Sequence, residues 1–167
     1  MMNLKILSEK RYGIIPNILA GAILVVGFAG FIDASYLTAK RMLGSPLTCY
    51  FFGGCDAVNA SPYSLMFGVP LSLYGSIFYL LVVLSSVAYL QHKKPIFGIA
   101  LMILTTLGFV FSGYFLFLQA VMIKAYCFYC VISVGTSTTN FILMSVAWRK
   151  YFYKPEVSAS VSSEIVG

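Results

Sequence analysis

Long apolar stretches alternate with short polar segments along the chain. Three stretches contain no Asp, Glu, Lys, Arg or His: residues 57–91, 95–123 and 125–148. Each is long enough to cross the hydrocarbon core of a bilayer as a helix, which takes about 20 mostly apolar residues. A fourth apolar run covers residues 14–32 and ends just before Asp33. The pattern predicts an all-α fold, an integral membrane bundle of four helices.

The polar segments set the expected ends of these helices. We expect the first helix over residues 14–37, the second from 68–70 to about 90, the third over 96–118 and the fourth over 126–148. The segment between the first two helices, residues 38–67, is then the only sizeable piece outside the membrane. It forms an outer loop in this interpretation.

Within the outer loop, Ser61 and Pro62 suit the N-cap and the first position of a short helix. A half-helix is therefore expected to cap the outer end of the bundle. The four helices form a single domain over residues 1–150. Residues 151–167 are polar and Ser-rich, which predicts a disordered cytoplasmic tail.

Small residues are expected where the helices touch. Lipid gives no hydrophobic gain for helix association, so close backbone approach matters instead. The candidates for helix contacts are Gly21, Gly27, Gly30, Gly75, Gly108, Gly113 and Gly135.

Composition agrees with the apolar pattern. The chain is 60% hydrophobic and only 10% charged, whereas soluble domains contain about a quarter charged residues. A water-soluble globule is excluded, and no fibrous or nucleic-acid-binding class fits.

The first apolar run has a rival interpretation as a secretory signal, because Lys5, Lys10 and Arg11 precede it and Gly27-Phe28-Ala29 resembles a small-residue cleavage site. Its length and poor cleavage cue favour a retained helix.

The net charge of +6 is explained by topology. With four spans, both termini lie on one side of the membrane. The basic residues expected on that side are Lys5, Lys10, Arg11, Lys93, Lys94, Arg149, Lys150 and Lys154, and those expected opposite are Lys40, Arg41 and Lys124. The positive-inside rule then places both termini in the cytoplasm.

All four cysteines fall on the outer side in this topology. Cys49 and Cys55 lie in the outer loop, and Cys127 and Cys130 form a C-x-x-C pair at the start of the fourth helix. Thiol pairs can be oxidised and stay oxidised in an extracytoplasmic compartment. A helix N-terminus also favours the thiolate of the first cysteine, which is the species that exchanges disulfides.

Two dithiol pairs on one face suggest an electron relay by mixed-disulfide exchange. The mobile loop pair would take electrons from a soluble partner and pass them to the fixed pair. Cys130 lies about one turn deeper than Cys127, so a quinone dissolved in the lipid is the expected sink. Three alternatives remain: a zinc site, which the C-x5-C spacing disfavours, two static disulfides, and free buried cysteines.

These residues together resemble the vitamin K epoxide reductase family, the four-helix membrane thiol–quinone oxidoreductases. The resemblance covers residues 14–148. It is carried by Cys49, by the run from Cys55 to Pro70 (CDAVNASPYSLMFGVP), by Gly75-Ser76-Ile77-Phe78-Tyr79 and by Cys127-Phe128-Tyr129-Cys130.

The resemblance implies roles for each cysteine. The partner's thiol would attack Cys55, the freed Cys49 would attack Cys127, and Cys130 would be left to reduce the quinone. It also implies a quinone pocket formed by the hydroxyl residue Ser61, by Tyr63 and Phe67 on the capping half-helix, and by Phe78 and Tyr79 on the second helix. The quinone would be of the ubiquinone, menaquinone or vitamin K type, and no metal is expected.

Two positions depart from the human member of the family. Its vitamin K site uses an Asn near the start of the second helix and a Tyr four residues after the second C-x-x-C cysteine, where this chain has Leu71 and Val134. This favours the prokaryotic branch, whose members oxidise thiols, over vitamin K epoxide reduction.

Prokaryotic members often carry a fused thioredoxin-like domain. The chain ends at Gly167, so we expect its redox partner to be a separate thioredoxin-like protein on the outer side. The protein itself is expected to be a monomer in the cell membrane. A non-enzymatic membrane subunit braced by structural disulfides is the remaining rival.

Two charged residues, Asp33 and Lys124, each have two alternative roles. Asp33, near the outer end of the first helix, is either a proton-handling group, since intramembrane carboxylates are costly and often functional, or an interfacial or helix-end residue. Lys124 either stabilises a thiolate at Cys127 or marks the membrane interface.

Overall fold

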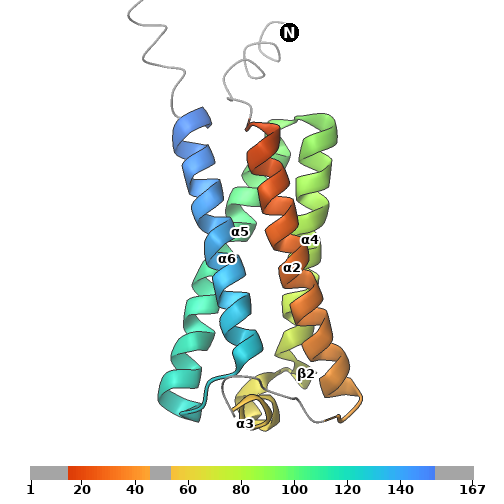
Figure 1. The fold of residues 1–167 in the computed structure, drawn as a ribbon, viewed down its shortest axis with the longest axis vertical. Helices are drawn as coiled ribbons and strands as arrows, with labels where there is room; N and C mark the ends of the chain where they lie inside the picture. Colours follow the sequence, from red (N-terminus) through yellow and green to blue (C-terminus); the bar gives the residue numbers. More distant parts are fainter. Residues whose placement is uncertain (1–14, 46–53, 153–167) are drawn as a thin grey trace, which may run out of the picture.

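Four long helices dominate the computed structural model, which describes residues 15–45 and 54–152 (Figure 1). They are α2 (Asn17–Met42), α4 (Leu71–His92), α5 (Pro95–Leu118) and α6 (Phe128–Ala147). All four are long and apolar enough to cross a membrane. The predicted four-helix bundle is confirmed.

The ends of the helices differ from the predicted ones. α2 continues past residue 37 to Met42, with Lys40 and Arg41 in its last turn, where cations suit the negative end of the helix dipole. Between the predicted third and fourth helices, the chain continues from the end of α5 as a π-helical turn, η2 (Gln119–Ile123). α6 likewise continues into η3 (Trp148–Phe152). The rest of the predicted tail lies outside the described residues.

The bundle is held by apolar contacts and close helix approach. α2 packs against α4 and α6, and α5 packs against the same two helices. Gly27 lies against Val82, Gly30 against the ring of Tyr79, and Gly108 against the ring of Phe78. These three glycines bring the helices together as predicted. Gly75 makes an ordinary contact with Ala34. The prediction was wrong for Gly21, Gly113 and Gly135, since nothing in the described part of the chain lies within 4 Å of a Cβ at these positions.

The outer loop forms a small cap across one end of the bundle (Figure 1). It contains a short helix, α3 (Cys55–Ala60), then a 3₁₀ turn, η1 (Pro62–Ser64), and a two-stranded antiparallel ribbon, β1 (Leu65–Met66) and β2 (Val69–Pro70). Ser61 does occupy the N-cap position of the turn and Pro62 follows it. The turn is, however, only three residues long.

The ribbon corrects one prediction. Phe67 was expected on the same half-helix as Tyr63, but it lies in the two-residue connection between β1 and β2. Phe67 and Gly68 both have positive φ, at 54° and 79°, which is the backbone of a tight hairpin turn. The helical turn therefore ends at Ser64, and only Tyr63 of the two lies on it.

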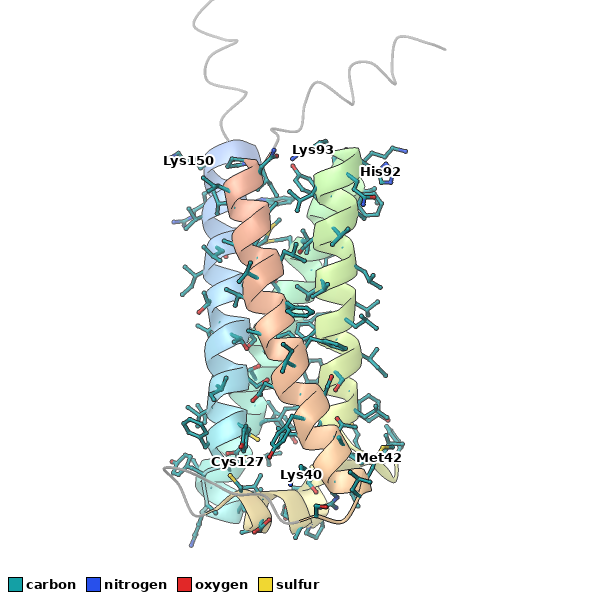
Figure 2. The ribbon with its side chains drawn as sticks, turned by 45° about the vertical axis from the view of Figure 1, so that its right-hand side comes forward. Lys40, Met42, His92, Lys93, Cys127 and Lys150 are labelled. Carbon is teal, nitrogen blue, oxygen red and sulfur yellow. The ribbon has the colours of Figure 1, made fainter. Side chains whose placement is uncertain are left out.

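Charged side chains mark the two ends of the bundle. Figure 2 shows His92, Lys93 and Lys150 at one end, and Lys40, Met42 and Cys127 at the other. α2 begins and α6 ends at the first of these ends (Figure 1). Lys93 and Lys150 thus lie at one end of the bundle and Lys40 at the other, as the sequence predicted. Four basic residues of that prediction lie outside the described residues: Lys5, Lys10, Arg11 and Lys154.

Candidate functional site

The C-x-x-C pair lies where α6 begins, at the end of the bundle covered by the cap. Cys127 is the N-cap residue of α6 and is 1% exposed, and Cys130 lies in the first turn of the helix. Both carry free thiols. The hydrogen bond with the Cys130 side chain lowers the pKa of Cys127 from 9.0 to about 7, helped by backbone N–H groups of Tyr129 and Cys130 and opposed by burial. Cys127 is therefore the thiol prepared for exchange.

The cap brings the outer loop onto this pair. Cys55 is the first residue of α3, is disulfide-bonded and is 1% exposed. It shares one apolar cluster with Cys127, Leu37 and Val58. Cys49 lies outside the described residues.

Gly54 explains how Cys55 comes so close to the pair. A Cβ atom on Gly54 would lie 2.8 Å from the carbonyl oxygen of Tyr126 and 2.9 Å from the Cβ of Ala125. Only a glycine lets the start of α3 touch the connection that leads into Cys127. Two segments far apart in the sequence thus place a loop cysteine next to the C-x-x-C pair.

A cavity of about 490 Å³ opens beside the two thiols. This volume lies within the range of small-molecule sites in proteins. Its wall includes Cys127 and Cys130 and is otherwise mainly apolar. All five residues predicted for the quinone site line it: Ser61, Tyr63, Phe67, Phe78 and Tyr79.

Phe78 and Tyr79 contribute rings from α4, and both are fixed from behind. The Tyr79 hydroxyl donates to the carbonyl oxygen of Ser133 at 2.7 Å and lies 2.8 Å from the Thr136 hydroxyl. Its ring rests on Gly30, and the Phe78 ring rests on Gly108. Because the Tyr79 hydroxyl is held by α6, Tyr79 offers the cavity mainly its ring.

The cap residues close the cavity on the outer side. The Ser61 hydroxyl donates to the carbonyl oxygen of Val58 at 2.8 Å, which closes the end of α3. Tyr63 is half-exposed, and Phe67 is 90% exposed at the hairpin turn. Phe67 thus lies at the rim of the cavity.

The two positions that departed from the human member also line the cavity. Leu71 lies at the start of α4, and Val134 lies one turn after Cys130 on α6. Neither side chain can donate or accept a hydrogen bond. The described wall is therefore apolar at both places.

Sequence reasoning missed one residue of the site, Gln119. It is 4% exposed at the start of η2, and its Oε1 accepts the backbone N–H of Cys127 at 3.1 Å. The available signal was a polar residue in an uncharged apolar run shortly before the C-x-x-C pair.

The two residues with open interpretations lie on different elements. Asp33 lies inside α2, well before its end at Met42, and its Oδ2 is buried with no hydrogen-bond partner among the described residues. The helix-end interpretation of Asp33 is therefore wrong. Lys124 ends η2 in the left-handed conformation, with φ of 53°.

Within residues 15–45 and 54–152, no group of three or more His, Cys, Asp or Glu residues is placed to hold a metal.

Comparison with known proteins agrees with the site. The sequence model of the vitamin K epoxide reductase family matches residues 21–145. The thiol-disulfide oxidoreductase LTO1 of Arabidopsis thaliana is 34% identical over 121 residues, which is 67% of this chain and 32% of that protein. The chain thus spans about a third of the length of this relative. The family match includes Cys55, Cys127 and Cys130 as well as the cavity residues.

Proposed function

The chain belongs to the vitamin K epoxide reductase family, and we propose that it oxidises a soluble thiol protein and passes the two electrons to a quinone in the membrane. Membership makes it an oxidoreductase of thiol–disulfide chemistry. The observation that carries the quinone step is the pair of free thiols, Cys127 and Cys130, in the wall of an apolar cavity of about 490 Å³. Apolar walls with aromatic rings suit a flat quinone head and a prenyl tail.

Electron entry is proposed at the outer loop. Because Cys127 and Cys130 carry free thiols, Cys49 is the candidate for the bond to Cys55. A thiolate of the partner would attack this disulfide, and a loop thiolate would then attack Cys127 when the C-x-x-C pair is oxidised. Two thiols of the partner become a disulfide, and their electrons and protons end on the hydroquinone.

The burial of Cys55 constrains the order of exchange. At 1% exposure, Cys55 must become accessible before a soluble partner can attack it, and we propose that α3 moves for this step. After that movement the freed Cys49 attacks Cys127, as the family resemblance implies. With α3 in place, Cys55 shares one apolar cluster with Cys127.

The side of the membrane follows from the charges. Lys93 and Lys150 lie at the end opposite Cys127 (Figure 2), and the positive-inside rule assigns such an end to the cytoplasm. We therefore place the cysteines on the outer side, with a soluble thioredoxin-like protein as the thiol donor.

Replacing the C-x-x-C cysteines tests this function. Cys127→Ala and Cys130→Ala should each abolish the reduction of a short-chain ubiquinone by a reduced thioredoxin-like protein, since each removes a sulfur of the reducing pair. Thr139→Val, an exposed change on the same helix, should keep the wild-type rate. Turnover that survives in either cysteine variant would show that the electrons take another route.

The Cys130→Ala protein also reports the order of exchange. In this protein the Cys127 thiolate can attack the loop disulfide, which breaks that bond and frees one loop thiol. With no Cys130 to resolve the product, the other loop cysteine should remain bonded to Cys127. Mass spectrometry of that bond identifies Cys49 or Cys55 as the loop cysteine that delivers the electrons.

A further inference from the structure

Asp33 places a carboxyl group among apolar helices. Its Oδ2 is buried with no hydrogen-bond partner among the described residues. α2 packs against α4 and α6, and neither of these helices contains a Lys or Arg. The nearest basic residue on α2 itself is Lys40, two turns later, which is about 10 Å along a helix. A carboxyl group at membrane depth is costly, and such groups are often functional.

The face of α2 that carries Asp33 touches the site on both sides of it. Gly30, one turn before Asp33, lies against the ring of Tyr79. Leu37, one turn after Asp33, shares an apolar cluster with Cys127. Residues three and four apart lie on the same face of a helix. Asp33 therefore lies on the face of α2 that is turned toward the site.

The carboxyl group is level with Ser133 of α6. The two helices run in opposite directions (Figure 1). They meet at the rings of Tyr36 and Tyr129, whose centroids are 5.3 Å apart, and at Gly27, where a Cβ would lie 3.8 Å from Nδ2 of Asn140. The carboxyl group lies between these two contacts, nearer to the tyrosine pair. On α6 the corresponding position is Ser133.

Three hydroxyl groups gather at this level, beside the cavity. The Tyr79 hydroxyl donates to the carbonyl oxygen of Ser133 at 2.7 Å and lies 3.1 Å from the Ser133 hydroxyl and 2.8 Å from that of Thr136. Tyr79 and Ser133 line the cavity. A hydroxyl group donates one hydrogen bond while it accepts others, so it can release a proton on one side as it receives one on the other. The cluster therefore offers a proton route between the level of Asp33 and the cavity.

The charge of Asp33 also acts on the C-x-x-C pair. The pKa of Cys127 is lowered mainly by its hydrogen bond with Cys130, and the negative charge of Asp33 is among the effects that oppose this lowering. Proton uptake by Asp33 and ionisation of Cys127 therefore favour each other. The other charged and titratable groups that α2, α4 and α6 bring to this half of the bundle are Tyr36, Lys40, Arg41, Tyr74, Tyr79 and Tyr129.

We propose that Asp33 is the proton carrier of the quinone step and that it reaches the cavity through the hydroxyl groups of Tyr79 and Ser133. This inference rests on the proposed function. As Cys127 and Cys130 form a disulfide, their two electrons pass to the quinone and their two protons are released. Asp33 gives its proton to one oxygen of the hydroquinone and regains one from the thiols. The other thiol proton goes to the second oxygen, so Asp33 ends as it began.

A single turnover of quinone by the reduced pair tests this role. The background is the full chain with Cys49→Ala and Cys55→Ala, reduced, freed of reductant and mixed without oxygen with a short-chain ubiquinone. Asp33→Asn has nearly the same shape but cannot carry the proton, so quinol formation should slow about a hundredfold, as expected for the loss of a general acid. Asp33→Glu keeps a carboxyl group and should retain most of the rate. Asp56→Asn, the same change on α3, is the matched control and should keep the full rate.

The order of the two Asp33 variants separates proton transfer from packing. A residue that only fills space tolerates Asn better than the longer Glu, whereas a proton carrier requires the reverse order. Loss of the negative charge in Asp33→Asn also favours the Cys127 thiolate, which by itself would speed the reaction. Thermal unfolding followed by circular dichroism should give Asp33→Asn a melting temperature no lower than that of the wild type, because the variant removes a costly intramembrane carboxyl group.

An undiminished rate in Asp33→Asn would overturn the inference, and so would a slower rate in Asp33→Glu than in Asp33→Asn. Failure of the proposed function has a different signature. If the background protein with Asp33 intact reduces no quinone, the proposed function fails and the inference with it. If that protein reduces quinone and Asp33→Asn does so equally fast, only the inference about Asp33 falls.

Discussion

Cys127 and Cys130 differ although they lie one helical turn apart. Cys127 precedes the first turn of α6 and receives hydrogen bonds from the Cys130 side chain and from backbone N–H groups, which lower its pKa to about 7. Below this pH Cys127 is mainly a thiol and exchanges slowly. Above it Cys127 is a thiolate, which attacks disulfides.

The hydrogen bond with Cys130 is the main cause of this shift, which gives a prediction. In a chain with Cys49→Ala and Cys55→Ala, Cys130→Ala should raise the pKa of Cys127 from about 7 toward 9.0, because the largest stabilising contact of the thiolate is lost. Cys130→Ser keeps a hydroxyl donor and should keep the pKa closer to 7. Thiolate absorbance in the far ultraviolet against pH measures both, and equal values in the two variants would contradict the assignment.

At the residue scale, the sequence predicts what depends on residue type and spacing. The four cysteines carry their own chemistry, and the five cavity residues follow from the family resemblance. Gln119 could not be assigned a role, because its contacts exist only when η2 lies beside the start of α6. The place of Phe67 in a turn depends on a positive φ, which the sequence signals only through the glycine that follows it.

At the scale of elements, α3 decides whether the loop and the C-x-x-C pair can meet. The short helix begins at Cys55, and Gly54 lets it lie directly on residues 125–126. The contact involves backbone atoms of Tyr126, which cannot turn aside as the end of a flexible side chain can.

Gly54→Ala should therefore slow electron transfer from the loop to the pair. The added methyl group displaces α3 from Tyr126, and a displacement of about 1 Å can cost on the order of a hundredfold in rate. The measurement is the rate at which a reduced thioredoxin-like protein reduces quinone, compared with the rate of quinone reduction by protein that was reduced beforehand. Only the first should fall.

Gly21→Ala provides the control, because none of the residues that the structure describes comes within 4 Å of a Cβ at that position. It should leave both rates unchanged. Equal slowing of both rates in Gly54→Ala would mean that the substitution damages the cavity or the pair itself, rather than the approach of α3.

The helices themselves were predictable because long uncharged runs leave few other structures in a bilayer. Their ends were not, since α2 extends through Lys40 and Arg41 and α5 turns into a π-helical segment. The small cap was predicted only as a half-helix. Its α3 and its hairpin depend on contacts with the bundle, which local sequence signals do not show.

At the scale of the whole molecule, the bundle has one end with the C-x-x-C pair and its cap, and the opposite end with Lys93 and Lys150 (Figure 2). The cavity lies between the cap and the helices, beside both thiols. The proposed mechanism requires that a reductant in water and an oxidant in lipid both reach this one site. The sequence predicted this polarity from the positions of its basic residues and cysteines.

The most direct test of the central claim is a single turnover without the loop cysteines. The Cys49→Ala, Cys55→Ala protein is reduced, freed of reductant and mixed without oxygen with a short-chain ubiquinone. We predict that each protein molecule reduces one quinone and ends with a Cys127–Cys130 disulfide, and that Cys130→Ala added to this protein reduces none. Absence of quinol in the first protein, or an equal yield of quinol in the second, would contradict the proposed mechanism.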